Sequence, residues 1–132
     1  MILVLFACVH NAGRSRMAEA LFNGVADPSK ARALSAGTQP AAAPHPEVVA
    51  TMREIGIELS KEPGQKLTPE LAAGCRWLVT MGCGESCPVL PELNRVDWEL
   101  PDPKGQPHER VRDIRETIRR HVEDLVRAHA WA

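Results

Sequence analysis

A cysteine, an arginine and a serine close to the start of the chain have the types and spacing of a nucleophilic site. Cys8 is followed six residues later by Arg14 and then by Ser15, in the stretch CVHNAGRS. A thiolate is a strong nucleophile, and the planar guanidinium of arginine offers a fork of donors that matches a tetrahedral oxyanion. The Ser15 hydroxyl can donate a hydrogen bond to the sulfur. These side chains predict a cysteine nucleophile beside an anion held by Arg14.

The backbone between these side chains is expected to bind the same anion. The apolar run from Ile2 to Ala7 predicts a buried strand, and the periodicity of Ala12 to Val25 predicts a helix after it. A turn from strand to helix can direct its N–H groups inward, and Gly13 supplies the freedom that such a turn needs. The simpler alternative is a buried thiol at Cys8 and a surface arginine. The predicted oxyanion-binding residues are Val9, His10, Asn11, Ala12, Gly13, Arg14 and Ser15.

Composition and charge narrow the class of protein. The chain has 132 residues, of which 44% are hydrophobic and 25% charged, as in a globular protein that buries a core. Its formal net charge of -1 gives no electrostatic reason to expect a nucleic-acid partner. No apolar run approaches the ~20 residues of a membrane span. The run from Ile2 to Ala7 is too short for a signal peptide and lacks a basic leader. We therefore expect a cytoplasmic protein with no membrane partner.

Three further cysteines, Cys75, Cys83 and Cys87, point to chemistry that involves sulfur. In a reducing compartment, extra cysteines more often indicate metal binding or redox chemistry than structural disulfides. A zinc site formed by these cysteines and a histidine is one alternative, but no second cysteine pair and no nearby His-x3-His motif completes it. We predict no metal site and no cofactor, and we interpret Cys75 as a packed thiol.

The predicted elements alternate between strands and helices. Strands are expected at Ile2–Ala7, Ala31–Ser35, Trp77–Met81 and Trp98–Leu100, and helices at Ala12–Val25, Glu47–Ile55, from Thr68 onward and His108–Ala128. Without repeats or a linker, this order indicates a single α/β domain over residues 1–132, with three layers and a small parallel sheet of about four strands between helices. Ligands bind outside the carboxyl ends of such strands. The loops that carry Cys8, Cys83 and Asp102 are therefore expected to meet at one edge.

At this point the chain resembles a known family. The stretch CVHNAGRS is similar to the Cys-x5-Arg-Ser loop of the low-molecular-weight protein tyrosine phosphatases and of the arsenate reductases that share their fold. The similarity extends along nearly the whole chain, because NAGRSRMAEALF, SAGTQP, MREIGIEL, VTMGCGESCPVLP and LPDPKG follow in the expected order. A Cys-x5-Arg loop near the amino terminus together with a late Asp-Pro pair is more specific than the loop alone.

The resemblance implies a role for each remaining chemical group. Asp102, before Pro103, is implied as the general acid that protonates a leaving oxygen. Cys83 and Cys87 stand where an arsenate reductase of the thiol-relay type needs its second and third thiols. The implied activity is the reduction of arsenate to arsenite through Cys8, Cys83 and Cys87, with weak phosphatase activity and a thioredoxin-type reductant. Phosphate and sulfate are expected to bind as analogues of arsenate, and a monomer is expected.

Two alternatives to the relay remain open. One is a phosphatase that acts on phosphotyrosine or another phosphomonoester with Cys8 and Asp102 alone. It is disfavoured because Lys104 stands where the tyrosine phosphatases usually have an aromatic residue, and because the chain has no tyrosine. The other is an idle oxyanion-binding or redox-sensing module. Some reductases of this family also hold a potassium ion, with ligands that could correspond to Asn11, Glu19 and Ser35, but the ligands expected between residues 61 and 67 are not recognisable.

Overall fold

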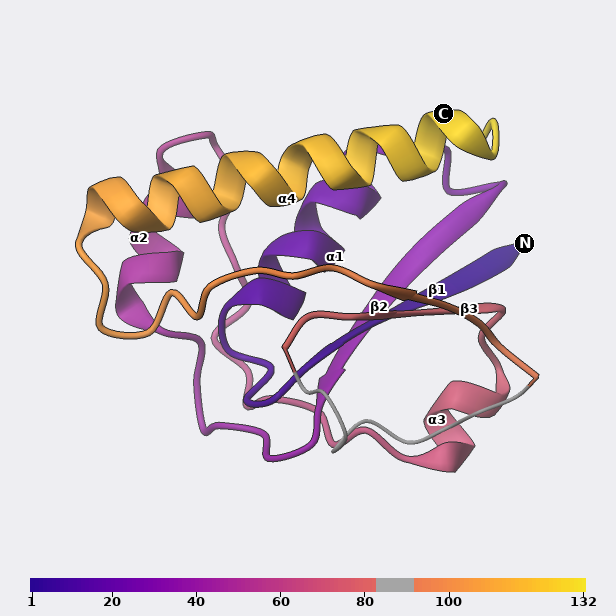
Figure 1. The fold of residues 1–132 in the computed structure, drawn as a ribbon, viewed down its shortest axis with the longest axis horizontal. Coiled ribbons are helices and arrows are strands. Elements are labelled where there is room, and N and C mark those ends of the chain that lie inside the picture. Colours follow the sequence, from indigo (N-terminus) through magenta and orange to yellow (C-terminus); the bar gives the residue numbers. More distant parts are fainter. Residues whose placement is uncertain (83–91) are drawn as a thin grey trace.

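The computed structural model describes residues 1–82 and 92–132, and these residues form a parallel sheet with helices on both faces (Figure 1). In chain order the strands and helices are β1 (Ile2–Cys8), α1 (Arg14–Val25), β2 (Ala31–Gly37), α2 (Pro46–Arg53), α3 (Pro69–Ala73), β3 (Trp77–Thr80), β4 (Asn94–Asp97) and α4 (His108–Ala128). The predicted α/β fold with a four-stranded parallel sheet flanked by helices is confirmed.

The strand order β2-β1-β3-β4 places β1 and β3 at the centre of the sheet. The chain first adds β2 on one side of β1 and then crosses over to add β3 on the other side. The direction of winding therefore reverses between β1 and β3, and a crevice outside the carboxyl ends of the strands forms at such a point. β1 ends there at Cys8, and Gly82 follows β3.

Alternate residues of β1 point into two separate apolar cores. Val4, Phe6 and Cys8 belong to the larger core, which α1 and α4 cover. Leu5 and Ala7 belong to the smaller core on the opposite face, where α3 packs. Figure 1 shows α4 along the upper edge of the molecule with α1 below it, and α3 at the lower edge. β1 is apolar on both faces, as a strand in a covered parallel sheet must be, and its last residue, Cys8, faces the larger core.

β1 and β2 end later than predicted, at Cys8 and Gly37, and α2 begins and ends earlier than predicted, at Pro46 and Arg53. Three further boundaries also differ. The first helix begins at Arg14 and not at Ala12, so that Ala12 and Gly13 stay in the preceding turn. The strand at Trp77 ends at Thr80 and not at Met81. The last strand is Asn94–Asp97, and Trp98–Leu100 is not a strand although Trp98 and Leu100 are buried. The prediction placed the last strand at the buried residues Trp98 and Leu100 and was wrong, because a strand at the edge of a sheet need not be apolar.

Local features explain why α3 and α4 form. The Thr68 hydroxyl accepts a hydrogen bond from the Leu71 N–H at 3.1 Å, and Pro69 occupies the first turn of α3. Residues with helical spacing line the buried face of α4: Val111, Ile114, Ile118, Val122 and Val126. Among the helices of residues 1–82 and 92–132, none combines the length and the hydropathy that a membrane span requires.

Candidate active site

The turn between β1 and α1 directs its carbonyl groups outward. The Cys8, Val9 and His10 oxygens accept hydrogen bonds from Thr38, Gln39 and Ala41, and the Ala12 oxygen accepts one from the His45 N–H at 2.8 Å. In a planar trans peptide the N–H points opposite to the C=O of the same unit. The N–H groups of residues 9, 10, 11 and 13 therefore point away from the 38–45 segment, and together they can form a concave cradle for an anion.

Close packing of two segments shapes this turn. A Cβ atom at Gly37 would lie 2.6 Å from the Val9 oxygen and 2.8 Å from the Asn11 nitrogen, so only glycine lets the 37–41 segment run this close. Asn11 itself has a φ of 50°, in the left-handed region that asparagine tolerates better than most residues. The shape of the turn therefore depends on glycine at position 37 and asparagine at position 11, two residues that carry no charge.

The thiol of Cys8 lies at the carboxyl end of β1 and meets the Ser15 hydroxyl. Cys8 is 2% exposed, and its Sγ lies 2.9 Å from Ser15 Oγ. Asn11 Nδ2 donates to the same Oγ at 2.9 Å. Because this oxygen already accepts from the amide, its own hydrogen is free to point at the sulfur, where it stabilises a thiolate. The predicted contact between Ser15 and Cys8 is present.

Arg14 connects the cradle with the loops that follow β3 and β4. Its Nη1 donates to the Leu100 oxygen at 3.0 Å, and its Nη2 lies 3.9 Å from Asp102 Oδ2. A Cβ atom at Gly82 would lie 2.2 Å from Arg14 Nη1, so the guanidinium occupies the space that any side chain at this position would take. Arg14 is only 8% exposed. The turn after β1 and the described start of the loop after β3 therefore meet the loop of Asp102 around Arg14.

Two backbone hydrogen bonds hold the loop that carries Asp102 on the carboxyl side of this aspartate. The Lys104 N–H donates to Asp102 Oδ1 at 3.0 Å, and the Gly105 N–H donates to Glu47 Oε1, in the first turn of α2, at 3.1 Å. Pro103 is buried, and its Cγ lies 2.8 Å from where a Cβ at Gly13 would stand. The Asp102 side chain is 47% exposed. Its carboxylate can thus reach both Arg14 and an incoming ligand.

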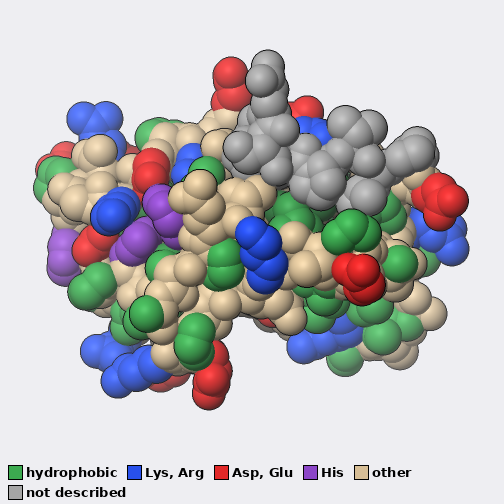
Figure 2. All heavy atoms as spheres, turned by 90° about the horizontal axis from the view of Figure 1, so that it is seen from below, with side chains coloured by type: hydrophobic (Ala, Val, Ile, Leu, Met, Phe, Trp, Pro, Cys, Tyr) green, Lys and Arg blue, Asp and Glu red, His purple; other side chains and the backbone are tan. Residues whose placement is uncertain are grey.

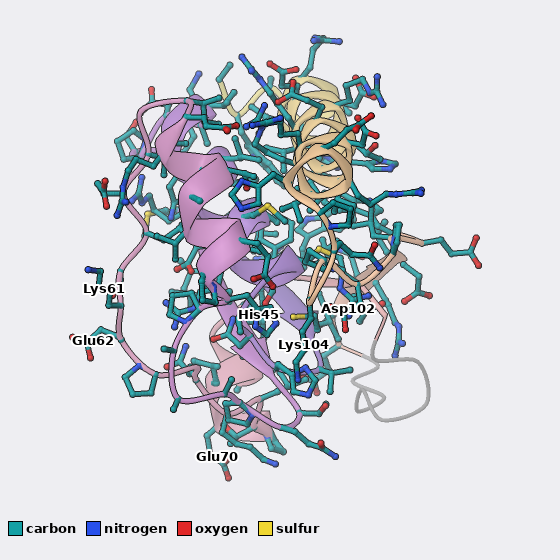
Figure 3. The ribbon with its side chains drawn as sticks, turned by 90° about the vertical axis from the view of Figure 1, so that its left-hand side faces the viewer. His45, Lys61, Glu62, Glu70, Asp102 and Lys104 are labelled. Carbon is teal, nitrogen blue, oxygen red and sulfur yellow. The ribbon has the colours of Figure 1, made fainter. Side chains whose placement is uncertain are left out.

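His45 is a residue at this rim that sequence reasoning missed. Its ring lies 3.3 Å from the position of a Cβ at Gly13, and its centroid is 6.3 Å from that of His10, edge to face. Burial lowers the pKa of His45, against the opposing effects of Glu47 and Asp102. Figure 3 shows His45 beside Asp102 and Lys104. The His-Pro pair at the start of a helix was the available signal, because it sits at the N-cap of α2.

The remaining cysteines divide into two cases. Cys75 belongs to the smaller core, on the face of the sheet opposite to Cys8. Burial raises the pKa of its thiol, and its Sγ lies 3.7 Å from the Leu71 oxygen, which agrees with a packed thiol. Cys83 and Cys87 lie outside the described residues. Within residues 1–82 and 92–132, no group of three or more His, Cys, Asp or Glu side chains could hold a metal ion.

The surface near the site carries both signs of charge. Figure 2 shows Lys and Arg side chains interspersed with Asp and Glu side chains on the face seen from below, and histidines gathered on one side of it. No single basic stripe crosses this view. Arg14 and the backbone N–H groups of the turn offer positive charge to a ligand here.

Comparison with known proteins finds relatives that cover most of this chain. A putative arsenate reductase from Halobacterium salinarum is 36% identical over 124 residues, which span 91% of this chain and 87% of the relative. A glutaredoxin arsenate reductase from a Synechocystis species is 32% identical over 127 residues, or 93% of this chain and 95% of the relative.

Solved structures give the same comparison in three dimensions. A thioredoxin-dependent arsenate reductase from Corynebacterium glutamicum superposes with a TM-score of 0.82 at 36% identity, covering 97% of this chain. This chain spans 61% of the length of that structure. An arginine phosphatase from Geobacillus stearothermophilus has a TM-score of 0.84 at 22% identity, which shows the shared fold alone. The model of one family matches residues 3–130. The chain therefore belongs to the low molecular weight phosphotyrosine protein phosphatase family.

Proposed function

We propose that this protein reduces arsenate to arsenite with Cys8 as the nucleophile and Cys83 and Cys87 as the relay. The prediction of an arsenate reductase is confirmed as a class of enzyme by the relatives, which carry that name over nine tenths of this chain. The observation that carries the proposal is the Cys8 sulfur, 2.9 Å from the Ser15 hydroxyl at the mouth of a turn whose N–H groups point inward.

The first step is the capture of arsenate. The N–H groups of the turn and the Arg14 guanidinium bind the oxyanion, and the Ser15 hydroxyl stabilises the Cys8 thiolate. The thiolate attacks arsenic and forms a sulfur–arsenic(V) bond. Asp102 gives a proton to the oxygen that departs, so that it leaves as water. Closing of the Asp102 loop over the ligand is not required for contact, because Asp102 Oδ2 already lies 3.9 Å from Arg14.

The second step moves two electrons to arsenic. The Cys83 thiolate attacks the Cys8 sulfur, the sulfur–arsenic bond breaks with its electron pair going to arsenic, and arsenite departs as arsenic(III). A Cys8–Cys83 disulfide remains. Cys87 then attacks Cys83, which frees Cys8 and leaves a Cys83–Cys87 disulfide. A dithiol reductant of the thioredoxin or glutaredoxin type returns this disulfide to two thiols and completes the cycle.

A phosphomonoester hydrolase is the second candidate, and the geometry of the site favours its chemistry but not an aromatic substrate. Cys8, Arg14 and Asp102 suffice for phosphoryl transfer to sulfur and hydrolysis. In the described part of the chain, however, the aromatic rings Phe6, Phe22 and Trp98 pack against one another in the larger core and none of them lines the rim. Lys104, which follows the Asp-Pro pair, is exposed. We therefore expect phosphatase turnover to be slow.

Steady-state turnover of arsenate tests the proposal. The assay contains thioredoxin, its reductase and NADPH, and a parallel assay contains glutaredoxin and glutathione. We expect Cys83→Ser and Cys87→Ser to abolish multiple turnover while hydrolysis of p-nitrophenyl phosphate persists, and Cys8→Ser to abolish both. Cys75→Ser, with its thiol on the opposite face, is the matched control that keeps both activities. Sustained arsenate turnover by the Cys83 and Cys87 double variant would contradict the relay.

A further inference from the structure

Arg16 is a buried cation that the mechanism does not use. It is 8% exposed and lies in the first turn of α1. Within the described part of the chain its guanidinium donates to backbone oxygens only: to Asn11 at 2.9 Å, to Ser60 at 3.4 Å and to Glu62. Among residues 1–82 and 92–132 no carboxylate lies within ion-pair distance of it. Burying a cation is costly unless hydrogen bonds compensate it, so these three contacts tie the turn firmly to residues 60–62.

A short chain of contacts connects Arg16 with the Cys8 sulfur. The Asn11 carbonyl that Arg16 holds belongs to the residue with a φ of 50°. The side chain of Asn11 accepts from the Gln65 N–H at 2.8 Å and donates to Ser15 Oγ at 2.9 Å. Ser15 Oγ in turn lies 2.9 Å from Cys8 Sγ. A displacement of the Asn11 backbone would therefore move the hydroxyl that stabilises the thiolate.

Arg16 also decides whether a potassium ion fits beside this turn. Asn11, Glu19 and Ser35 stand at positions that could correspond to the potassium ligands of some reductases. In this structure the Asn11 carbonyl accepts from Arg16 and the Asn11 side-chain oxygen accepts from Gln65, while the Ser35 hydroxyl donates to Glu19 at 2.6 Å. The oxygens at residues 11, 60 and 62 converge on a guanidinium, which already carries the positive charge. These residues do not fit an external monovalent cation.

The 60–62 segment is arranged to present its backbone to Arg16. Figure 3 shows the Lys61 and Glu62 side chains pointing out of the fold. Ser60, Lys61 and Glu62 are all exposed, and the Ser60 hydroxyl accepts from the Glu62 N–H at 3.1 Å. This local turn leaves the Ser60 and Glu62 carbonyl groups free to accept from Arg16.

We propose that Arg16 is a positioning residue, a built-in cation that holds Asn11, and through it Ser15, in register with the Cys8 sulfur in place of a bound potassium ion. This inference rests on the proposed role of Cys8 as the nucleophile, but not on arsenate as the substrate or on the later cysteines. Arg16 does not touch the anion; Arg14 does.

The test compares Arg16→Met, which keeps the length of the side chain, with Arg16→Lys, which keeps the charge without the fork. Arg119→Met is the matched control, because Arg119 is exposed and, among the residues that the structure describes, pairs with Glu116 and Glu123 on the outer face of α4. The first readout is the pH dependence of iodoacetamide alkylation at Cys8, followed by peptide mapping, with Cys75 as the slow internal reference. The second is kcat and KM for p-nitrophenyl phosphate in potassium and in choline salts of equal ionic strength.

For Arg16→Met we expect the midpoint of Cys8 alkylation to rise by about one pH unit, a tenfold loss of thiolate below the midpoint. We expect kcat to fall about 10-fold or more, with a smaller change in KM. Arg16→Lys is expected to lie between the wild type and Arg16→Met, Arg119→Met to match the wild type, and the wild type to turn over equally in both salts.

Three results would overturn the inference. One is an Arg16→Met variant that folds and keeps the alkylation midpoint and kcat of the wild type, because Arg16 would then have a structural role alone. Another is a wild-type protein that loses most of its activity in choline salts, because this result would show that the turn needs a bound potassium ion. If Arg16→Met does not fold, an Arg16→Lys that matches the wild type in both readouts rejects the inference. Failure of arsenate turnover alone would reject the proposed function and leave the Arg16 result standing, because neither readout needs arsenate.

Discussion

At the scale of single residues, the site depends on glycines as much as on charged groups. Gly82 has a φ of 91°, and a Cβ there would lie 2.2 Å from Arg14 Nη1. Gly82→Ala therefore adds backbone strain and also displaces the guanidinium. We expect kcat/KM for p-nitrophenyl phosphate to fall about 10-fold or more, because small displacements of a binding group cost that much. The free energy of unfolding, measured with urea, should fall by about 1 to 2 kcal/mol.

The chain offers a control that separates the two effects. Gly56 has a φ of 81° at the end of α2, and nothing lies within 4 Å of a Cβ placed there. Gly56→Ala should cost a similar amount of stability through backbone strain while kcat/KM stays at the wild-type value. Equal losses of activity in both variants would show that Gly82 acts through stability alone and not through the Arg14 guanidinium.

How far the sequence predicts the site also depends on single residues. Cys8, Arg14 and Ser15 are neighbours along one turn, so their spacing alone was enough to propose that they act together. The contacts of Asn11 with Gln65, of Arg14 with Gly82 and of Gly13 with His45 join residues that are far apart in sequence. No local pattern encodes such contacts, because they depend on where the 38–45 and 60–65 segments pass over the turn.

At the scale of elements, prediction succeeded where burial produces a pattern. β1 is apolar on both faces, and α4 carries apolar residues on one face with charged residues on the other, so both were recognised. β4 was misplaced because it is an edge strand: Asn94, Arg95 and Asp97 are exposed, and it is held by backbone pairing to β3 and by a Thr80 hydrogen bond to Asp97. An edge strand needs no apolar alternation, so hydrophobicity could not locate it.

The packing of α2 against α4 depends on a buried arginine. Arg115 Nη1 donates to the Thr51 oxygen at 2.7 Å and to Glu54 Oε1 at 3.1 Å, and Arg115 is 9% exposed. Arg115→Met keeps the apolar stem but leaves a buried carbonyl without its donor. We expect the free energy of unfolding in urea to fall by about 1 to 3 kcal/mol with an unchanged m-value. Arg119→Met, which loses only exposed ion pairs, should change it by less than about 1 kcal/mol.

The same contact should depend on pH. Hydrogen bonds from Arg112, and then its charge together with Arg115, lower the pKa of Glu54 from 4.5 to about 2. A lowered pKa means that the stabilisation is present above pH 4.5 and is lost as the pH falls through about 2. The difference in stability between the wild type and Arg115→Met should therefore shrink between these two pH values. A difference that stays constant down to pH 2 would assign the whole effect to the Thr51 carbonyl.

At the scale of the whole molecule, the carboxyl edge of the sheet gathers groups that only the folded chain brings together. Cys8 is the last residue of β1, Gly82 lies just after β3, and Asp102 lies in the loop after β4. His45 and Glu47 come from the start of α2. An oxyanion bound there contacts segments separated by most of the sequence. Such a ligand binds the folded state and not the unfolded one, so it must raise the stability of the fold as a whole.

Inorganic phosphate, which has the tetrahedral shape of arsenate, allows this linkage to be measured without any turnover. For the reduced protein we expect the midpoint of thermal unfolding to rise with the logarithm of the phosphate concentration. At 100 times its Kd, phosphate should add about 2.7 kcal/mol to the free energy of unfolding. Arg14→Met should lose most of this gain, because it removes the guanidinium that can bridge the anion and Asp102 Oδ2, 3.9 Å away.

Two comparisons decide whether the gain comes from the cradle. Sulfate should reproduce the effect of phosphate, because its oxygens can meet the same N–H groups, whereas chloride at equal ionic strength should not. Alkylation of Cys8 should abolish the gain, since the added group would occupy the space between the sulfur and the turn. If phosphate stabilised the wild type, Arg14→Met and the alkylated protein equally, the anion would bind elsewhere, and the carboxyl edge of the sheet would not be the binding site inferred from Cys8, Arg14 and Ser15.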